Sequence, residues 1–359
     1  MRPLARLALL TLPISFACAG SSTDLTCDSC EIQLEYLTTL GDEGDGPGAV
    51  PSYPTSVAQD SRGRYFVTAP YTGEERPYVF NAGGVFQSRL GGIGEGPREF
   101  QRADYLSVSE DSVLVYDGQQ ARIAVYSPDL RYVRSLPGIP PVYRWIEFPD
   151  GTLLANRTDY RSPPLVHLGR SGELIAEFGA AYDEFDRSAW LRPVRYIAPS
   201  SSRGVWSVQL AFRFVIREWD RAGNLIRTVE PETEWFREHD FPRSPSPDET
   251  PQSRINGIWE DDRGLLWIVG TAASANWSDG LGQPRRIEGQ DVHEVVDPDL
   301  VYDTVIEVLD PDAEEPVLYH RRLEEGLMWP VQPGVLAVAE ETELGFYRIK
   351  LFEADLLLP

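Results

Sequence analysis

Short apolar runs with interspersed polar positions recur along the whole chain and predict β-strands. RYFVTA (64–69), SVLVYD (112–117) and LLWIVG (265–270) are rich in the β-branched and aromatic residues that favour strands. Turn sequences containing Gly, Asp, Asn or Pro separate these runs. The pattern therefore indicates an all-β protein.

The turns form two alternating series, and their spacing predicts a repeated unit. One series begins with DSRG (60–63) and the other with NAGG (81–84), and six such pairs follow one another. Five of the six turn-to-turn distances lie between 18 and 21 residues. Each pair fits four antiparallel strands, so six units predict a six-bladed β-propeller. We expect the blades at residues 53–91, 103–138, 144–179, 194–230, 254–324 and 327–356.

The sixth unit has no fourth strand of its own, because the chain ends soon after EADL (353–356). The run at 31–40 has the pattern of a fourth strand and belongs to no unit. We therefore expect residues 31–41 to complete the sixth blade, so that the propeller spans 31–359. Such closure would place both ends of the domain in one sheet and remove an open edge.

One glycine-rich sequence occurs twice, and its context decides between two interpretations. LGDEGDGP (40–47) aligns without a gap with LGGIGEGP (90–97). Each copy follows a strand-like run, and neither opens a helical pattern. Dinucleotide-binding glycine loops open a helix. Both copies are therefore predicted to be turns that connect neighbouring blades.

The charge balance excludes one class of partner. The chain has 359 residues and a formal net charge of −23. An acidic surface repels phosphate backbones, so we expect no binding of nucleic acid. Lys350 is the only lysine, which removes most candidates for phosphate-binding or Schiff-base lysines.

The N-terminus has the composition of an export signal. Arg2 and Arg6 flank the start of an apolar stretch at 7–17, which is too short to span a bilayer. ISFAC (14–18) approximates a bacterial lipobox that ends at Cys18. We expect a signal peptide over residues 1–17 and lipidation of Cys18.

The alternative export route is cleavage after Ala19, which would release the protein into the periplasm. Under the lipoprotein interpretation, residues 18–30 form a tether and the protein lies in the cell envelope, held to a bacterial membrane by its lipid alone. Lipidation of Cys18 would leave Cys27 and Cys30 as a pair. In an oxidising compartment this pair predicts a disulfide.

Four sequences together resemble those of bacterial six-bladed propeller lipoproteins related to NHL-repeat and TolB-like propellers: CDSCEIQL, GRYFV, GGIGEGPREF and DDRGLLWIVG. The resemblance covers the mature chain and implies the fold, because these motifs are turns and core strands. Related six-bladed folds include metal-dependent lactonases and peptidyl lyases. The resemblance therefore implies a calcium-dependent hydrolase or lyase as the alternative to a binding protein.

Catalytic motifs give no support to that alternative. The sequence contains no G-x-S-x-G, H-E-x-x-H or G-x-x-x-x-G-K. Its four histidines lie on different units without metal-ligand spacing: His167, His239, His293 and His320. We expect a binding protein without a cofactor.

The extra length of the chain gathers in segments that a propeller places on one face. These segments are 180–193, 231–253 and 271–302. Long loops on a rigid scaffold often carry function. They contain the aromatic and arginine side chains typical of binding surfaces: Trp190, Trp235, Phe236, Trp277, Arg285 and Arg286. We expect a monomer that binds a protein, peptide or carbohydrate-like ligand there, and a packed cap without a ligand is the alternative.

A second set of candidates lies at the starts of the inner strands, near the channel: Asp104, Arg144, Arg195 and Asn256. Arg144-Trp145-Ile146 aligns with Arg195-Tyr196-Ile197, which predicts two arginines at equivalent channel positions. They would hold an anionic or carbohydrate-like ligand, unless each pairs with a neighbouring acid. Asp104 and Asn256 are the candidates for a calcium site, but two ligands are too few.

Overall fold

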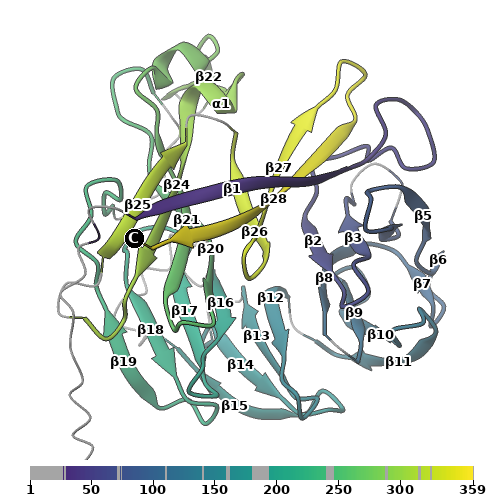
Figure 1. Cartoon of the computed structure of the whole chain (residues 1–359). Helices are drawn as coiled ribbons and strands as arrows, with labels where there is room; N and C mark the ends of the chain where they lie inside the picture. Colours follow the sequence, from purple (N-terminus) through teal and green to yellow (C-terminus); the bar gives the residue numbers. More distant parts are fainter. Residues whose placement is uncertain are drawn as a thin grey trace, which may run out of the picture.

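The computed structural model describes most of the predicted propeller domain. The described residues are 27, 30–70, 73, 75–109, 111–139, 141–158, 162–179, 194–239, 246–287, 290–313, 317–323 and 326–358. They form six four-stranded sheets arranged around a centre (Figure 1). The all-β prediction and the six-bladed propeller are confirmed.

The strands of each blade run antiparallel from the channel outward. Blade 1 contains β2 (Ser56–Gln59), β3 (Tyr65–Thr68), β4 (Tyr78–Phe80) and β5 (Phe86–Arg89). Blade 2 contains β8 (Ala103–Val108), β9 (Val113–Asp117), β10 (Arg122–Tyr126) and β11 (Tyr132–Pro137). Blade 3 contains β12 (Val142–Glu147), β13 (Leu153–Arg157), β14 (Leu165–Leu168) and β15 (Leu174–Phe178).

The remaining blades follow the same order. Blade 4 contains β16 (Arg195–Pro199), β17 (Val205–Gln209), β18 (Ile216–Trp219) and β19 (Leu225–Val229). Blade 5 contains β20 (Arg254–Glu260), β21 (Leu266–Ala273), β24 (Tyr302–Leu309) and β25 (Val317–Leu323). Blade 6 contains β26 (Met328–Gln332), β27 (Val335–Glu341), β28 (Tyr347–Leu357) and β1 (Glu31–Leu40).

The first described strand closes the last blade, as the sequence predicts. β1 pairs antiparallel with β28, with Glu31 opposite Leu357 and Leu40 opposite Ile349. Figure 1 shows β1, in purple, lying along the yellow β28. Ile32 and Leu40 are fully buried, because this strand covers apolar surface at both of its ends.

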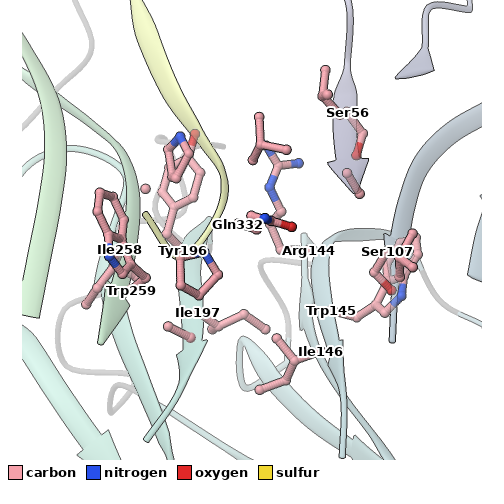
Figure 2. Close-up of a pocket in the computed structure, with 18 of the residues that line it drawn as sticks. Ser56, Ser107, Arg144, Trp145, Ile146, Tyr196, Ile197, Ile258, Trp259 and Gln332 are labelled. Atoms are coloured by element: carbon pink, nitrogen blue, oxygen red, sulfur yellow. The ribbon is translucent and has the colours of Figure 1, made fainter. Parts of the chain in front are cut away.

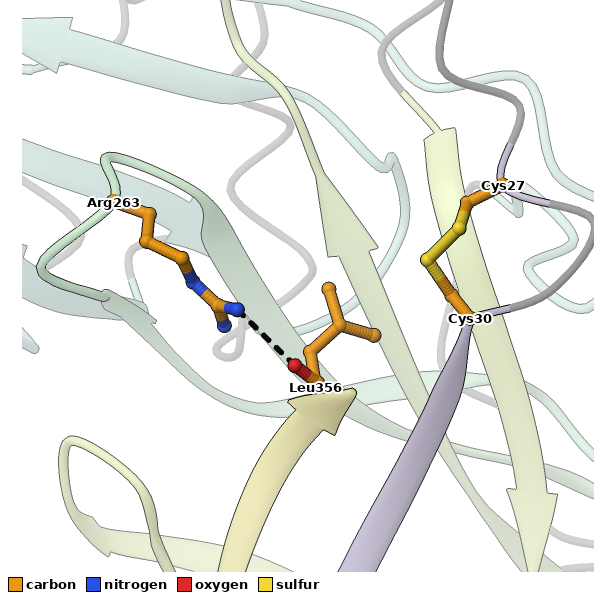
Figure 3. The surroundings of a disulfide bond; sticks show 4 residues. All are labelled: Cys27, Cys30, Arg263 and Leu356. Atoms are coloured by element: carbon orange, nitrogen blue, oxygen red, sulfur yellow. Dashed lines mark hydrogen bonds between the residues drawn. A yellow bond between two sulfur atoms is a disulfide. The ribbon is translucent and has the colours of Figure 1, made fainter. Parts of the chain in front are cut away.

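Two arginines of blade 5 form hydrogen bonds with one end of the β1–β28 strand pair. The Arg263 guanidinium donates a hydrogen bond to the Leu356 carbonyl at 3.1 Å, and Arg321 donates to the Ile32 carbonyl. A disulfide joins Cys27 and Cys30 just before β1, with their Cα atoms 5.3 Å apart (Figure 3). Cys30 packs in an apolar cluster shared by blades 5 and 6.

The glycine-rich sequences are turns, and each encloses a carboxylate of the chain itself. In the second copy, the Gly96 amide donates to the Glu99 carboxylate at 2.8 Å, between β6 (Gly92–Ile93) and β7 (Glu99–Phe100). In the first copy, the Gly48 amide donates to Asp42 at 2.9 Å. Each turn thus uses its backbone amides to bind a carboxylate of the protein itself. The glycines are therefore accounted for without a bound phosphate.

The apolar core lies between neighbouring blades rather than at the centre. One cluster joins the facing sheets of blades 1 and 2, and includes Phe66, Phe100 and Tyr126. Neighbouring inner strands also contact one another around the whole ring. The centre is thus left as a channel. Within the described ranges, no helix is long and apolar enough to cross a membrane.

Candidate functional site

The central channel contains two chambers, each of about 320 Å³. The upper chamber lies at the starts of the inner strands, and the lower chamber lies toward their ends. Four residues line both chambers: Arg144, Tyr196, Asn256 and Trp329. We call these four residues the waist.

Tyrosines dominate the upper chamber, and three of them lie at or near the start of an inner strand. Five tyrosines line it: Tyr53, Tyr105, Tyr143, Tyr196 and Tyr302. Tyr143 lies at a β-bulge in β12, between the paired residues Val142 and Arg144. A bulge breaks the alternation of a strand, so consecutive side chains can face the same side. Tyr143 and Arg144 accordingly both line the chamber.

The Arg144 guanidinium is surrounded by tyrosine rings. Its central carbon lies 4.6 Å from the ring centre of Tyr143, 5.1 Å from that of Tyr105 and 5.5 Å from that of Tyr196. The guanidinium donates a hydrogen bond of 3.0 Å to the Tyr143 carbonyl. No carboxylate among the described residues forms an ion pair with it. Within the described part of the chain, Arg144 is therefore a cation without a counter-ion.

The Tyr196 phenol beside this cation remains neutral and cannot balance its charge. The hydroxyl groups of Tyr143 and Tyr196 share a hydrogen bond of 3.1 Å, and their rings meet edge to face. Burial holds the pKa of Tyr196 well above its ordinary value. One O–H donates within this pair, so the other hydroxyl can donate a hydrogen bond to a ligand near Arg144.

The electrostatic character of the upper chamber contrasts with the acidic chain. Arg254 adds a second, exposed cation at the mouth. The described residues that line this chamber include no Asp or Glu. Asp299 approaches the rim of the chamber near Tyr53. The pKa of Tyr53 is raised to about 12, mainly by loss of contact with water and to a smaller extent by Tyr347 and Asp299. The chamber itself is locally positive in a protein of net charge −23.

The lower chamber is mainly apolar. Figure 2 shows Arg144 and Tyr196 projecting into the channel from neighbouring blades, with Ile146 and Ile197 below them. Glu147 is the acidic residue of the described lining, and it accepts hydrogen bonds from the hydroxyls of Ser109 and Ser112. Its charge is therefore already engaged by the protein.

Comparison with known proteins supports the architecture. Residues 55–142 match the family model DUF5128, described as a 6-bladed beta-propeller. A DUF4221 family member from Bacteroides vulgatus superposes with a TM-score of 0.61 at 11% identity, over 92% of this chain and 99% of its own. A candidate exported protein from Bacteroides fragilis superposes with a TM-score of 0.55 at 11% identity, over 94% of this chain and 98% of its own. The chain is a six-bladed β-propeller.

More remote matches carry no functional argument. A virginiamycin B lyase from Staphylococcus aureus gives a TM-score of 0.48 at 11% identity, over 90% of this propeller and 99% of the lyase. No curated protein sequence matches significantly. At these identities the structural matches establish the fold alone.

The expected equivalence of Arg144 and Arg195 is wrong by one residue. Glu147 pairs with Leu153 and Pro199 with Val205, so Arg144 corresponds to Tyr196. The expectation rested on the similarity of Arg-Trp-Ile and Arg-Tyr-Ile, which stand one residue out of register. In the following turns, Arg203 (φ 67°) takes the position that Gly151 (φ 75°) holds in blade 3. Arg195 is buried outside both chambers, and its amide donates to Asn156.

Asp104 and Asn256 both lie at bulges of their strands but do not converge. Asp104 pairs with Arg102 at 2.9 Å within blade 2 and lines neither chamber. Asn256 does reach the waist, where its amide donates to the Met328 carbonyl at 3.0 Å. Within the described ranges, no group of three or more His, Cys, Asp or Glu side chains could hold a metal ion.

Two aromatics of the connector 231–253 are not the exposed anchors that the sequence suggested. Phe236 is buried, and Trp235 is half-buried against the same apolar cluster of blades 4 and 5. The Trp235 indole donates to the Glu307 carboxylate at 2.7 Å. These side chains anchor the connector to the propeller because their polar and apolar partners both lie beneath it.

Among its described residues, the insert 271–302 reaches the channel through its two ends. Thr271 and Tyr302 line the upper chamber. Trp277 is half-buried in the short helix η2 (Trp277–Gly280), while Arg285 and Arg286 are exposed on β22 (Arg285–Ile287). β22 pairs with β23 (Gln290–Val292), and Figure 1 shows it near α1 (Pro298–Val301) at one end of blade 5. Trp190, segment 180–193 and Cys18 lie outside the described residues.

The tyrosines of the upper chamber were missed at the sequence level. Tyr105, Tyr143 and Tyr196 each stand at or near the start of an inner strand, which was the available signal. Glu307 was also missed, although a lone acid within the apolar run TVIEVL (304–309) is unusual. Its carboxyl is buried, and burial raises its pKa to about 7.

Proposed function

We propose that the protein is a binding protein that holds the anionic group of a small ligand, or of a peptide end, at Arg144. The observation that carries this proposal is the guanidinium among three tyrosine rings with no carboxylate partner in the described structure. A charge removed from water is unfavourable unless it is paired. A ligand carboxylate would provide the missing partner.

The surrounding groups define what such a ligand can be. The planar guanidinium can form two parallel hydrogen bonds with a carboxylate. The Tyr143 and Tyr196 hydroxyls and the Asn256 amide can orient other polar atoms of the ligand. A chamber of about 320 Å³ lies at the small end of the usual range for ligand sites.

The loop-rich face supports the same location. Arg254 follows the connector 231–253, and Thr271 and Tyr302 are the ends of the insert, so both long segments meet the mouth of the upper chamber. Long segments around a rigid channel are common positions for specificity. A protein, peptide or carbohydrate-like ligand would be contacted by these segments after its anionic group enters.

Calorimetry with a charged and a neutral ligand of the same shape tests this proposal. Hexanoate should bind with heat that hexanamide does not produce, and Arg144→Gln should weaken hexanoate at least tenfold. Arg285→Gln is the matched control, because Arg285 is exposed on β22 and lines neither chamber. Equal binding by Arg144→Gln and the unaltered protein would refute the role of Arg144.

We also propose that the protein is exported and attached to the cell envelope through a lipid on Cys18. The support is the apolar stretch at 7–17, the lipobox-like ISFAC and the disulfide that accounts for the other two cysteines. The structural relative from Bacteroides fragilis is itself a candidate exported protein. Mass spectrometry of membrane-extracted protein should find an acylated N-terminal Cys18. A soluble protein beginning at Gly20 would contradict this.

A further inference from the structure

The lower chamber continues the channel beyond Arg144 and can extend the ligand site. The waist residues line both chambers, so a molecule held at Arg144 lies between the two spaces. The upper chamber opens toward tyrosine hydroxyls and Arg254. The two spaces therefore differ in the chemistry that they offer to the rest of the ligand.

Apolar side chains from successive blades form most of the wall of the lower chamber. They include Val108, Ile146, Ile197, Ile258, Trp259 and Val331. Ile146 and Val331 are only half-buried, which leaves part of each side chain available to a ligand. Such a wall favours hydrocarbon over a hydrated group.

Polar groups in this wall are engaged within the protein or turned away from the chamber. The Ser109 and Ser112 hydroxyls donate to Glu147, and the Gln332 amide donates to Gln59 at 3.0 Å. The hydroxyl of Ser107 and the indole nitrogen of Trp145 have no partner, but both atoms are buried in the wall. The lower chamber consequently offers few hydrogen bonds to a sugar ring.

We propose that the ligand is an amphiphilic acid whose anionic group pairs with Arg144 and whose apolar tail enters the lower chamber. This inference rests on the proposed function of Arg144. It adds that affinity depends on the tail, because the tail leaves water for an apolar wall. A polar acid such as galacturonate would satisfy Arg144 but would leave its hydroxyl groups without partners below the waist.

A homologous series of acids tests the tail directly. Calorimetric affinities should rise from acetate through butyrate and hexanoate to octanoate, by about fourfold for each methylene that is buried. 4-Phenylbutyrate should also bind more tightly than acetate, and galacturonate should bind more weakly than hexanoate. An affinity independent of tail length, or a preference for galacturonate over octanoate, would overturn the inference.

Variants of the wall locate the tail. Ile146→Gln and Val331→Gln should each weaken octanoate at least tenfold and leave acetate unchanged, so that acetate binding verifies an intact fold. Val133→Gln is the control, because Val133 is 57% exposed on β11. Octanoate binding that resists both wall variants would place its tail elsewhere and overturn the inference.

The same titrations separate failure of the tail from failure of the proposed function. If acids bind through Arg144 without regard to chain length, the proposed function stands and the amphiphile is wrong. If no acid in the series depends on Arg144, the proposed function fails and the present inference fails with it.

Discussion

The hydroxyl groups of Tyr143 and Tyr196 lie 3.1 Å apart and join the inner strands of blades 3 and 4 within the upper chamber. Each ring also lies close to the Arg144 guanidinium. The pair therefore holds two walls of the upper chamber around its half-buried cation. This arrangement orients Arg144 before any ligand arrives, which reduces the ordering that binding requires.

Removing one hydroxyl tests this link. Tyr143→Phe keeps the ring but leaves the Tyr196 hydroxyl without its partner, so we expect a loss of about 1 kcal/mol in the free energy of unfolding. Denaturant titration measures this loss. Tyr36→Phe is the control, since its hydroxyl bonds to Thr39 at an exposed position and should matter less. Equal stability of both variants would show that the hydroxyl pair does not stabilise the channel.

The buried Glu307 predicts a dependence of stability on pH. Burial raises its pKa from 4.5 to about 7, with opposing hydrogen bonds from Trp235 and Thr233. The unfolded chain therefore ionises at a lower pH than the folded protein. Glu307 favours folding most below pH 4.5, and this contribution falls as pH rises to about 7, by roughly 3 kcal/mol in all.

Glu307→Gln removes this titration while keeping an acceptor for the Trp235 indole. Relative to the unaltered protein, the variant should gain stability between pH 4.5 and pH 8, as measured by denaturant unfolding at the two values. Glu232→Gln, at an exposed position of the same connector, should show no such gain. A constant difference between Glu307→Gln and the parent across this range would contradict the buried, neutral carboxyl.

Because β1 closes blade 6, its deletion is expected to lower the thermal stability of the propeller strongly. Deleting residues 31–40 would expose the edge of β28 and the apolar surface beneath Ile32 and Leu40. We expect a lower melting temperature and a less cooperative transition by calorimetry. Arg263→Gln leaves the strand in place and removes the bond to the Leu356 carbonyl together with the exposed ion pair to Asp261, so it should cost only about 1 kcal/mol. A truncated protein that melts like the full chain would place the closure elsewhere.

A single glycine tests how closely this strand packs on blade 1. Gly84 has φ 77°, and an added Cβ would lie 2.2 Å from the Thr39 carbonyl oxygen of β1. Gly264 has φ 83° with nothing within 4 Å of the same position. Gly264→Ala should cost about 1–2 kcal/mol from backbone strain alone, and Gly84→Ala should cost about 1–3 kcal/mol more. Equal losses in denaturant titrations would contradict the close approach of β1.

The blade count and the closing strand were predictable because turns recur at a nearly constant distance. Glycine and aspartate mark where strands end whatever the rest of the protein does. The channel lining needs a register accurate to one residue. Aligning Arg-Tyr-Ile of blade 4 with Arg-Trp-Ile of blade 3 put Arg195 at the position of Arg144, whereas the strand pairing places Tyr196 there and Arg203 at the position of Gly151.

The interpretation of the loops failed for a different reason. Composition indicated that Trp235 and Phe236 were available for binding, but it could not show that Glu307 and an apolar cluster lie beneath them. Burial of a loop side chain depends on residues far away in the sequence. The prediction that this face carries the site instead rests on the ends of the loops, Thr271, Tyr302 and Arg254, which line the upper chamber.

A crystal structure of the protein with bound hexanoate tests the central claim most directly. The account predicts the carboxylate within hydrogen-bonding distance of the Arg144 guanidinium, beside the Tyr143 and Tyr196 hydroxyls, with the hydrocarbon chain in the lower chamber. Crystals of Arg144→Gln grown with the same acid should lack this density. A carboxylate bound at Arg254 or on the outer surface, with Arg144 uncontacted, would contradict it.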